Sequence, residues 1–155
     1  MRFKLFPWQK SKSLLSEEDN RLVVKAIRQA EKATSGEVRV FIESRCAWMN
    51  AMDRAAEIFF SLKMEQTEQR NAVMVYVAIK DRQLAVFGDE GIHQRVGSEY
   101  WNNIVRDMLR DFSAENYGKG IAECVIQIGN ALQQYFPYDK DTDKNELPDE
   151  IVFGR

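Results

Sequence analysis

The most constraining feature of this sequence is an apolar run that leads into a hairpin, within residues 67–91. Residues 72–79, AVMVYVAI, are rich in valine and too few to span a membrane, so they are predicted to form a buried strand. The polar residues 80–82 interrupt this run, and an apolar pattern resumes over residues 84–87, which is typical of a hairpin with a polar turn. The second strand ends at the glycine-bracketed residues 88–91, after which a helical pattern begins.

The segment before the hairpin predicts a helix followed by a strand. Ser16 precedes acidic residues, as at a helix start, and apolar residues then recur at helical spacing. Residues 37–43 alternate between apolar and other side chains, which indicates a strand. The second face of this strand begins with Glu37 and Arg39, and we expect these two residues near solvent or near a site.

A second helix is predicted between this strand and the apolar run. Residues 50–64 have helical spacing, with Asp53, Arg54 and Glu57 expected on the outward face. A strand, a crossover helix and a central strand in this order favour a right-handed βαβ unit, in which the two strands are parallel.

Two more apolar stripes at helical spacing follow the hairpin, over residues 101–112 and 121–136. Leu109 belongs to the first stripe. Because both helices have a single apolar face, we expect them to cover a sheet rather than to form a bundle. The acidic tail is low in apolar residues until residues 151–153, which could dock as an edge strand.

Length and composition indicate one soluble domain. The 155 residues can form one ordinary core, and we assign residues 16–137 to the domain, 1–15 to an N-terminal arm and 138–155 to an acidic C-terminal tail. Apolar residues make up 45% and charged residues 30%, as in soluble globular proteins. The net charge of −2 provides no basic surface for nucleic acid, so we expect no nucleic-acid partner.

Cysteine and histidine usage limits the available chemistry. Cys46 and Cys124 have no CxxC or other metal-binding spacing, and Cys124 falls on an apolar helix face, where a buried inert thiol is expected. His93 is the only histidine, so zinc sites with several histidines are excluded, and we expect it on the surface or in a loop.

The N-terminal arm combines aromatic and basic residues. It either packs on the domain or contacts a protein partner, and weak attachment to a membrane surface is a third alternative. Pro7 and neighbouring polar residues break any apolar core that a secretory signal would need. Because no apolar run of about 18 residues is present, we expect no transmembrane segment and a cytoplasmic location.

The order of several short motifs resembles the TPM domain family, over about residues 16–136. The motifs are Thr34 to Glu37, Arg70-Asn71, Asp81-Arg82, Gly88 to Gly91, and Tyr117 with Gly120-Ile121. The resemblance implies an α/β fold, a three-layer α/β/α sandwich with a Rossmann-like mixed sheet of three to four strands. Members of the family include a thylakoid-lumen protein of photosystem II repair with a proposed acid phosphatase activity, and some members bind calcium. This sequence departs from the family pattern at Ala72, where a glycine commonly follows the asparagine, and we expect it to be without the exported or membrane-anchored architecture that is usual in the family.

Three carboxylates are predicted to meet at one end of the sheet. If the first and central strands are parallel, Glu37 lies at the same end as Asp89 and Glu90. Calcium binds six to eight oxygen ligands, so we expect a calcium site there. Alternatively, Asp89 and Glu90 only cap the following helix.

Three further residues are candidates for binding an anion or supporting this site: Arg70, Asn71 and Arg82. Arg82 is also expected to form a surface ion pair with Asp81 in the hairpin turn. The tail imitates the ligand spacing of an EF-hand between Asp139 and Glu150, but it has no glycine at the sixth position, so we reject that motif.

Three functions are therefore compatible with the sequence. The first is a divalent-cation-binding interaction or regulatory module, with an unknown protein partner. The second is a metal-dependent acid phosphatase-like hydrolase, which rests on the family resemblance, since the sequence has no P-loop and no cluster of His and Asp for two metals. The third is a membrane-peripheral accessory protein.

Overall fold

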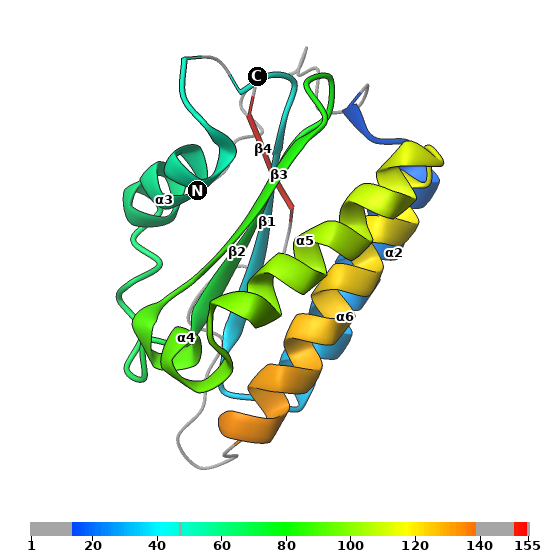
Figure 1. Cartoon of the computed structure of the whole chain (residues 1–155). Helices are drawn as coiled ribbons and strands as arrows, with labels where there is room; N and C mark the ends of the chain where they lie inside the picture. The colour runs from blue at the N-terminus through cyan, green and yellow to red at the C-terminus, as the bar shows by residue number, and fades with distance from the viewer. Residues whose placement is uncertain (1–13, 47, 139–150, 155) are drawn as a thin grey trace.

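The computed structural model describes residues 14–46, 48–138 and 151–154, so the predictions for residues 1–13 and 139–150 lie outside its described part. The helices and strands, in chain order, are α2 (Glu17–Lys32), β1 (Glu37–Glu43), α3 (Ala51–Ser61), β2 (Ala72–Ala78), β3 (Gln83–Gly88), α4 (Glu90–Val96), α5 (Ser98–Ser113), α6 (Tyr117–Tyr135) and β4 (Val152–Phe153). The strands form one sheet in the order β3-β2-β1-β4 (Figure 1). None of the described helices is long and apolar enough to cross a bilayer.

The central part of the sheet is the predicted βαβ unit followed by the predicted hairpin. β1 and β2 are parallel, with Glu37 opposite Ala72, and α3 makes the crossover between them. β3 is antiparallel to β2, with Val73 opposite Gly88. The register brings the starts of β1 and β2 and the end of β3 to the same end of the sheet, as the sequence predicted.

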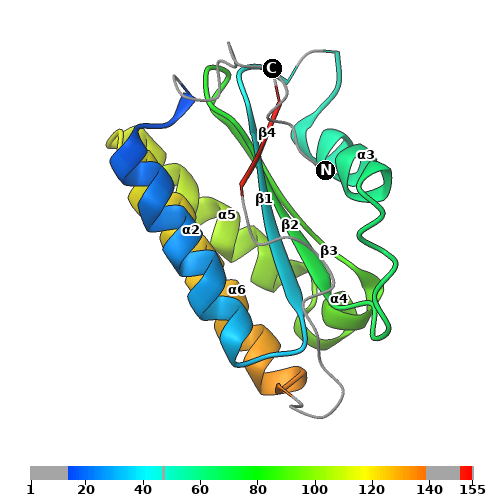
Figure 2. The same ribbon diagram turned by 180° about the vertical axis from the view of Figure 1, so that it is seen from behind.

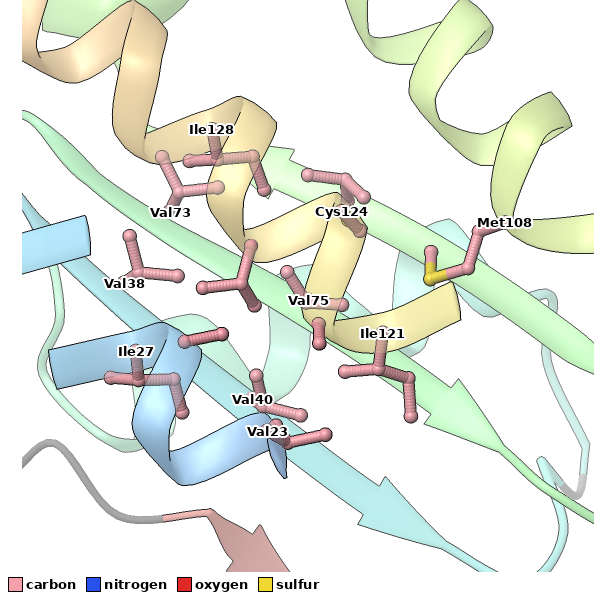
Figure 3. Packing of buried hydrophobic residues seen from close by; sticks show 14 of the residues in the cluster. Val23, Ile27, Val38, Val40, Val73, Val75, Met108, Ile121, Cys124 and Ile128 are labelled. Carbon is pink, nitrogen blue, oxygen red and sulfur yellow. The ribbon is translucent and has the colours of Figure 1, made fainter. Parts of the chain in front are cut away.

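Helices cover both faces of the sheet, which confirms the three-layer α/β/α sandwich. α2, α5 and α6 lie on one face and α3 lies on the other (Figures 1 and 2). The larger cluster of buried side chains packs between the sheet and the three helices, and it includes Val23, Ile27, Val38, Val40, Val73, Val75, Met108, Ile121 and Ile128 (Figure 3). Each such side chain contributes about 1.5–3 kcal/mol relative to exposure. The smaller cluster lies under α3 and includes Phe59, Met74 and Tyr76.

α6 differs from the predicted helix with a single apolar face. It packs against both α2 and α5 as well as the sheet, and its small residues are buried along with its large ones. A Cβ at Gly129 would lie 2.6 Å from the Cβ of Ala30, so glycine allows α6 to approach α2 closely. Leu109 on α5 also differs from the prediction, since it is 41% exposed.

The end of the chain adds the fourth strand, as predicted. β4 pairs in parallel with β1, with Val152 opposite Phe41, so β3 and β4 are the two edges of the sheet. Of the two alternatives predicted for Glu37 and Arg39, a position near solvent is wrong, because they are only 3% and 8% exposed, and a position near a site stays a prediction. Every residue of β1 is buried, since it lies between β2 and β4 and beneath α2 and α6.

Candidate functional site

The candidate site lies at the end of the sheet where β3 leads into α4. The backbone N–H of Asp89 donates to the carbonyl oxygen of Ala72 at 2.9 Å, which places Asp89 beside Ala72. Glu37 lies on the other side of Ala72. Because neighbouring strands are about 4.8 Å apart, the Cα atoms of Glu37 and Asp89 are separated by about 10 Å.

Asp89 forms a bidentate ion pair with Arg70. The Nε and Nη2 atoms of Arg70 donate to the two carboxylate oxygens of Asp89 at 2.7 and 2.8 Å. The carboxylate of Glu90 lies 3.6 Å from Nη1 of the same guanidinium. The hydrogen bonds from Arg70 to Asp89 are the main cause that raises the pKa of Arg70. Arg70, Asp89 and Glu90 together are called the Arg70 site below.

Asp89 also begins the helix that follows. It is the N-cap residue of α4, and its Oδ1 accepts a hydrogen bond from the backbone N–H of Glu90 at 2.8 Å. Asp89 is 3% exposed, whereas the side chain of Glu90 is 62% exposed. The predicted capping role is therefore confirmed for Asp89, whose carboxylate serves the helix and Arg70 at the same time.

The loop before β2 is fixed against the start of α4. The backbone N–H of Gly91 donates to the carbonyl oxygen of Arg70 at 2.8 Å, and a Cβ at Gly91 would lie 2.1 Å from the carbonyl oxygen of Gln69. Only glycine fits there. Asn71 holds the neighbouring loop, because its Nδ2 donates to Ser35 Oγ at 3.3 Å. Asn71 thus supports the backbone around the Arg70 site.

A groove of about 380 Å³ opens beside the Arg70 site and is called the β3 groove below. Besides the Arg70 site, it is lined by Met52 and Phe60 of α3, residues 86–88 of β3, His93 of α4 and Trp101 of α5. His93 Nδ1 accepts a hydrogen bond from Trp101 Nε1 at 3.0 Å, and His93 is exposed, as predicted. The groove therefore joins apolar walls to a charged end.

The structure brings together some of the predicted site residues and separates others. Asp89, Glu90 and Arg70 are in contact. Arg82 lies at the other end of β3, in the turn. The predicted pair between Asp81 and Arg82 is wrong, because Asp81 instead accepts a hydrogen bond from Arg45 Nη1 at 2.9 Å.

The predicted calcium site requires carboxylates that lie close together. Within the described residues, no group of three or more His, Cys, Asp and Glu side chains could hold a metal ion. Glu37 lies one strand away from Asp89 on the other side of Ala72. The calcium site predicted at Glu37, Asp89 and Glu90 stays a prediction, and of these three carboxylates only Asp89 and Glu90 contact the guanidinium of Arg70 in the described part of the chain.

A second polar cluster, at the opposite end of the α3 face, was missed in the sequence. Arg54 donates to both carboxylate oxygens of Glu43 at 2.8 Å, and the Tyr76 hydroxyl also donates to Glu43. Arg54 therefore turns inward, contrary to the prediction. Burial, followed by the bond to Glu43, raises the pKa of Tyr76 far above its usual value. Glu43, Arg54 and Tyr76 are called the Glu43 cluster below.

Both cysteines of the chain, Cys46 and Cys124, are buried free thiols. Cys124 is 3% exposed, and burial raises the pKa of its thiol, which confirms that it is a core residue. Cys46 is also buried, and its backbone N–H donates to Asp81 at 2.7 Å. Neither thiol lines the β3 groove.

Comparisons with known proteins agree with the resemblance seen in the sequence. The family model of the TPM domain matches residues 9–131. The chain is similar to the NMR structure of the BA42 protein from the psychrophilic bacterium Bizionia argentinensis, with 38% identity and a TM-score of 0.81 over 90% of this chain and 95% of that chain. The N-terminal domain of a protein from P. gingivalis shares the fold, with 17% identity and a TM-score of 0.63 over 79% of each chain. No curated protein matches the chain. Since the family model covers most of its length, this chain belongs to the TPM domain family.

Proposed function

We propose that this TPM domain is an interaction module whose binding surface, the β3 groove, is modulated by a divalent cation at the Arg70 site. The observation that supports this function is the convergence of two carboxylates, Asp89 and Glu90, on the single guanidinium of Arg70. This leaves a surplus of negative charge at the charged end of the groove. Calcium is the cation that we propose, because it accepts carboxylate, carbonyl and water oxygens in flexible geometries.

The geometry favours weak binding. Both oxygens of Asp89 already accept hydrogen bonds from Arg70, so a cation must compete with the guanidinium. Glu90 is the accessible ligand, since its side chain is 62% exposed. With two neighbouring carboxylates and the remaining ligands from water or backbone, we expect a dissociation constant of about 10⁻⁴–10⁻³ M, as in the weaker calcium sites of proteins.

Cation binding would change the groove through Arg70. A calcium ion shared by Asp89 and Glu90 weakens their attraction for the guanidinium, which can then turn toward water or toward the groove. Met52 and Phe60, which are 47% and 49% exposed, form the apolar wall that a partner would contact. The module thus binds its partner with different affinities in the presence and absence of the cation.

A calcium titration followed by backbone NMR tests this function. We expect saturable shifts of the amides of Arg70 and residues 89–91, which disappear in Glu90→Gln. The matched control is Glu99→Gln, because Glu99 is an exposed acid in the first turn of α5, as Glu90 is in α4. Glu99→Gln should keep the calcium response. Equal shifts in both variants, or no saturable shifts in the unaltered protein, would contradict the proposal.

The enzyme alternative is separated from the module by turnover. In the same samples, a generic phosphomonoester should remain intact with calcium or magnesium. Saturable hydrolysis that is lost in Asp89→Asn and Glu90→Gln would instead assign a metal-dependent phosphatase to the Arg70 site.

A further inference from the structure

A tryptophan is fully exposed in the connection between β1 and α3. Trp48 is 100% exposed and is the most exposed of the large apolar side chains in the described part of the chain. Its neighbour Met49 is 36% exposed, and Met52 in the first turn of α3 is 47% exposed. Exposed apolar groups of this size, close together in the sequence, mark a surface that contacts something else.

The backbone around Trp48 is fixed by its neighbours. The φ of Trp48 is 72°, a left-handed conformation that favours glycine over a bulky side chain. Cys46 holds the connection on both sides, because its backbone N–H donates to the carboxylate of Asp81 at 2.7 Å and its Sγ donates to the carbonyl oxygen of Met49 at 3.2 Å. Burial does not explain a strained residue whose ring is fully exposed, and strained residues of this kind cluster at functional sites.

Basic side chains surround this connection. The turn between β2 and β3 lies beside it, since the backbone N–H of Lys80 donates to the carbonyl oxygen of Ser44 at 2.9 Å. Both segments lie at the end of the sheet away from α4 (Figures 1 and 2). Lys80 and Arg82 in the turn and Arg45 in the connection are exposed. Trp48, Met49, Arg45, Lys80 and Arg82 together are called the Trp48 patch below.

Positive charge exceeds negative charge at the Trp48 patch. Asp81 binds Arg45 at 2.9 Å, and Asp53 in the first turn of α3 accepts a hydrogen bond from the Asn50 side chain at 3.1 Å. Within the described part of the chain, no ion pair engages Lys80 or Arg82. These two cations are therefore available to bind anionic groups.

We propose that the Trp48 patch binds the surface of a membrane that contains anionic lipids. Tryptophan suits the boundary between headgroups and acyl chains, because its ring is apolar and its Nε1–H can still donate to water or to a headgroup. The headgroup phosphates attract Lys80 and Arg82 while Trp48 inserts between the lipids. A lipid surface can enclose a fully exposed ring without a matching pocket, whereas a protein partner would need one, so the exposure of Trp48 favours lipid.

Co-sedimentation of the full chain with lipid vesicles tests this proposal. Vesicles of phosphatidylcholine and phosphatidylglycerol in equal parts should bind the protein at low salt, and vesicles of phosphatidylcholine alone should bind it at least about tenfold more weakly. Trp48→Gly should lower the affinity for the anionic vesicles at least about tenfold. Because glycine suits a φ of 72°, this variant should fold normally.

Leu22→Ala is the matched control for Trp48→Gly. It removes an apolar side chain that is 43% exposed on α2, on the other face of the sheet, and it should leave the affinity unchanged. Equal losses in the two variants would overturn the proposal, as would a failure of the unaltered protein to bind anionic vesicles.

Single charge removals test the contribution of the basic residues. Lys80→Ala and Arg82→Ala should each lower the affinity for anionic vesicles about fivefold, because each removes one cation near the lipid surface. Lys25→Ala removes an equal charge from an exposed position of α2 and should leave the affinity unchanged. Equal losses in all three variants would show that the charge of the whole protein, and not the Trp48 patch, attracts it to the vesicles.

Tryptophan fluorescence shows which side chain enters the lipid. The chain has three tryptophans, Trp8, Trp48 and Trp101, and Trp101 is only 6% exposed. Anionic vesicles with brominated acyl chains should quench part of the emission, and this quenching should disappear in Trp48→Phe. Quenching that persists in Trp48→Phe and disappears in Trp8→Phe would assign the lipid contact to the N-terminal arm and overturn the proposal.

The outcomes also separate this proposal from the cation-modulated module. Trp48→Gly leaves Arg70, Asp89 and Glu90 intact, so it should weaken vesicle binding and keep the calcium response. A protein that responds to calcium but does not bind anionic vesicles overturns the lipid contact and leaves the proposed function untouched.

Discussion

Two arginine–carboxylate pairs lie at opposite ends of the α3 face of the sheet, with nearly the same geometry but different surroundings. Arg54 binds Glu43 through two hydrogen bonds of 2.8 Å, and Arg70 binds Asp89 through hydrogen bonds of 2.7 and 2.8 Å. In both pairs the carboxylate is buried, while the arginine side chain is 31% exposed in Arg54 and 38% exposed in Arg70. The two pairs themselves are therefore equivalent.

The additional partners of the carboxylates differ. Glu43 also accepts a hydrogen bond from Tyr76, which is fully buried beneath α3, whereas Asp89 accepts one from the backbone of Glu90 at the end of a groove. Removing Glu43 would leave a buried hydroxyl without its acceptor, and water cannot easily replace it. The comparison teaches that the Glu43 cluster stabilises the fold, while the Arg70 site is open enough to exchange partners.

The largest expected effect follows from removing Glu43. Glu43→Ala leaves Arg54 and Tyr76 without their shared acceptor, so we expect the free energy of unfolding to fall by about 3 kcal/mol. Urea unfolding followed by far-UV circular dichroism measures this loss. Glu57→Ala is the control, because it removes the exposed carboxylate that binds the same Arg54 at 2.8 Å, and it should cost less than about 1 kcal/mol. Equal losses in the two variants would show that burial of Glu43 contributes nothing.

A smaller loss is expected at the Arg70 site. Asp89→Ala removes both the acceptor of Arg70 and the N-cap of α4, and the exposed arginine can turn to water, so the same measurement should show a loss of about 2 kcal/mol. Asp89→Asn keeps a capping side chain and should recover about 1 kcal/mol of this loss.

Glu90→Ala provides the matched control for Asp89. It removes the exposed carboxylate near the same arginine and should change the free energy of unfolding by less than about 0.5 kcal/mol. If Asp89→Ala destabilises the protein as much as Glu43→Ala, the two ends of the sheet are energetically alike and the contrast between them is wrong.

Much of the fold that positions these two arginine–carboxylate pairs is predictable from the periodicity of the sequence. The alternation in residues 37–43 and the valine-rich run after Asn71 define two strands, and the helical segment between them requires a parallel crossover. The hairpin then brings Asp89 to the end of the sheet where Arg70 lies. A glycine-bracketed acidic residue before a helical pattern is typical of an N-cap, and Asp89 has that role.

Periodicity does not reveal which polar residues are buried. It places Glu37 and Arg39 on the second face of β1, but the depth of that face depends on helices and strands far away in the sequence. Arg54 likewise starts on the outward part of α3, and only its long side chain allows it to reach back to Glu43. Which polar side chains pair with one another in the interior depends on how α3 lies over the sheet. The spacing of residues within α3 or within β1 does not specify that arrangement.

The smallest expected effect is a change in the free energy of unfolding at alkaline pH, and it is specific to Tyr76 of the Glu43 cluster. The pKa of Tyr76 is raised by burial first and by its bond to Glu43 second, so the folded protein holds the phenol proton more tightly than the unfolded chain. The stabilisation is complete below the unfolded tyrosine pKa of about 10 and decreases above it, by about 1.4 kcal/mol per pH unit.

Tyr76→Phe isolates this contribution from those of Tyr100 and Cys124, whose pKa values are also raised by burial. At pH 8 the variant should be less stable than the unaltered protein by about 1 kcal/mol, because Glu43 loses one donor. Urea unfolding at increasing pH should show this difference shrinking to nothing by about pH 11. Asp89→Asn leaves Tyr76 in place and should therefore keep a constant difference over the same range. A constant difference for Tyr76→Phe as well would mean that the hydroxyl titrates normally, and that the Glu43 cluster is as open to water as the Arg70 site.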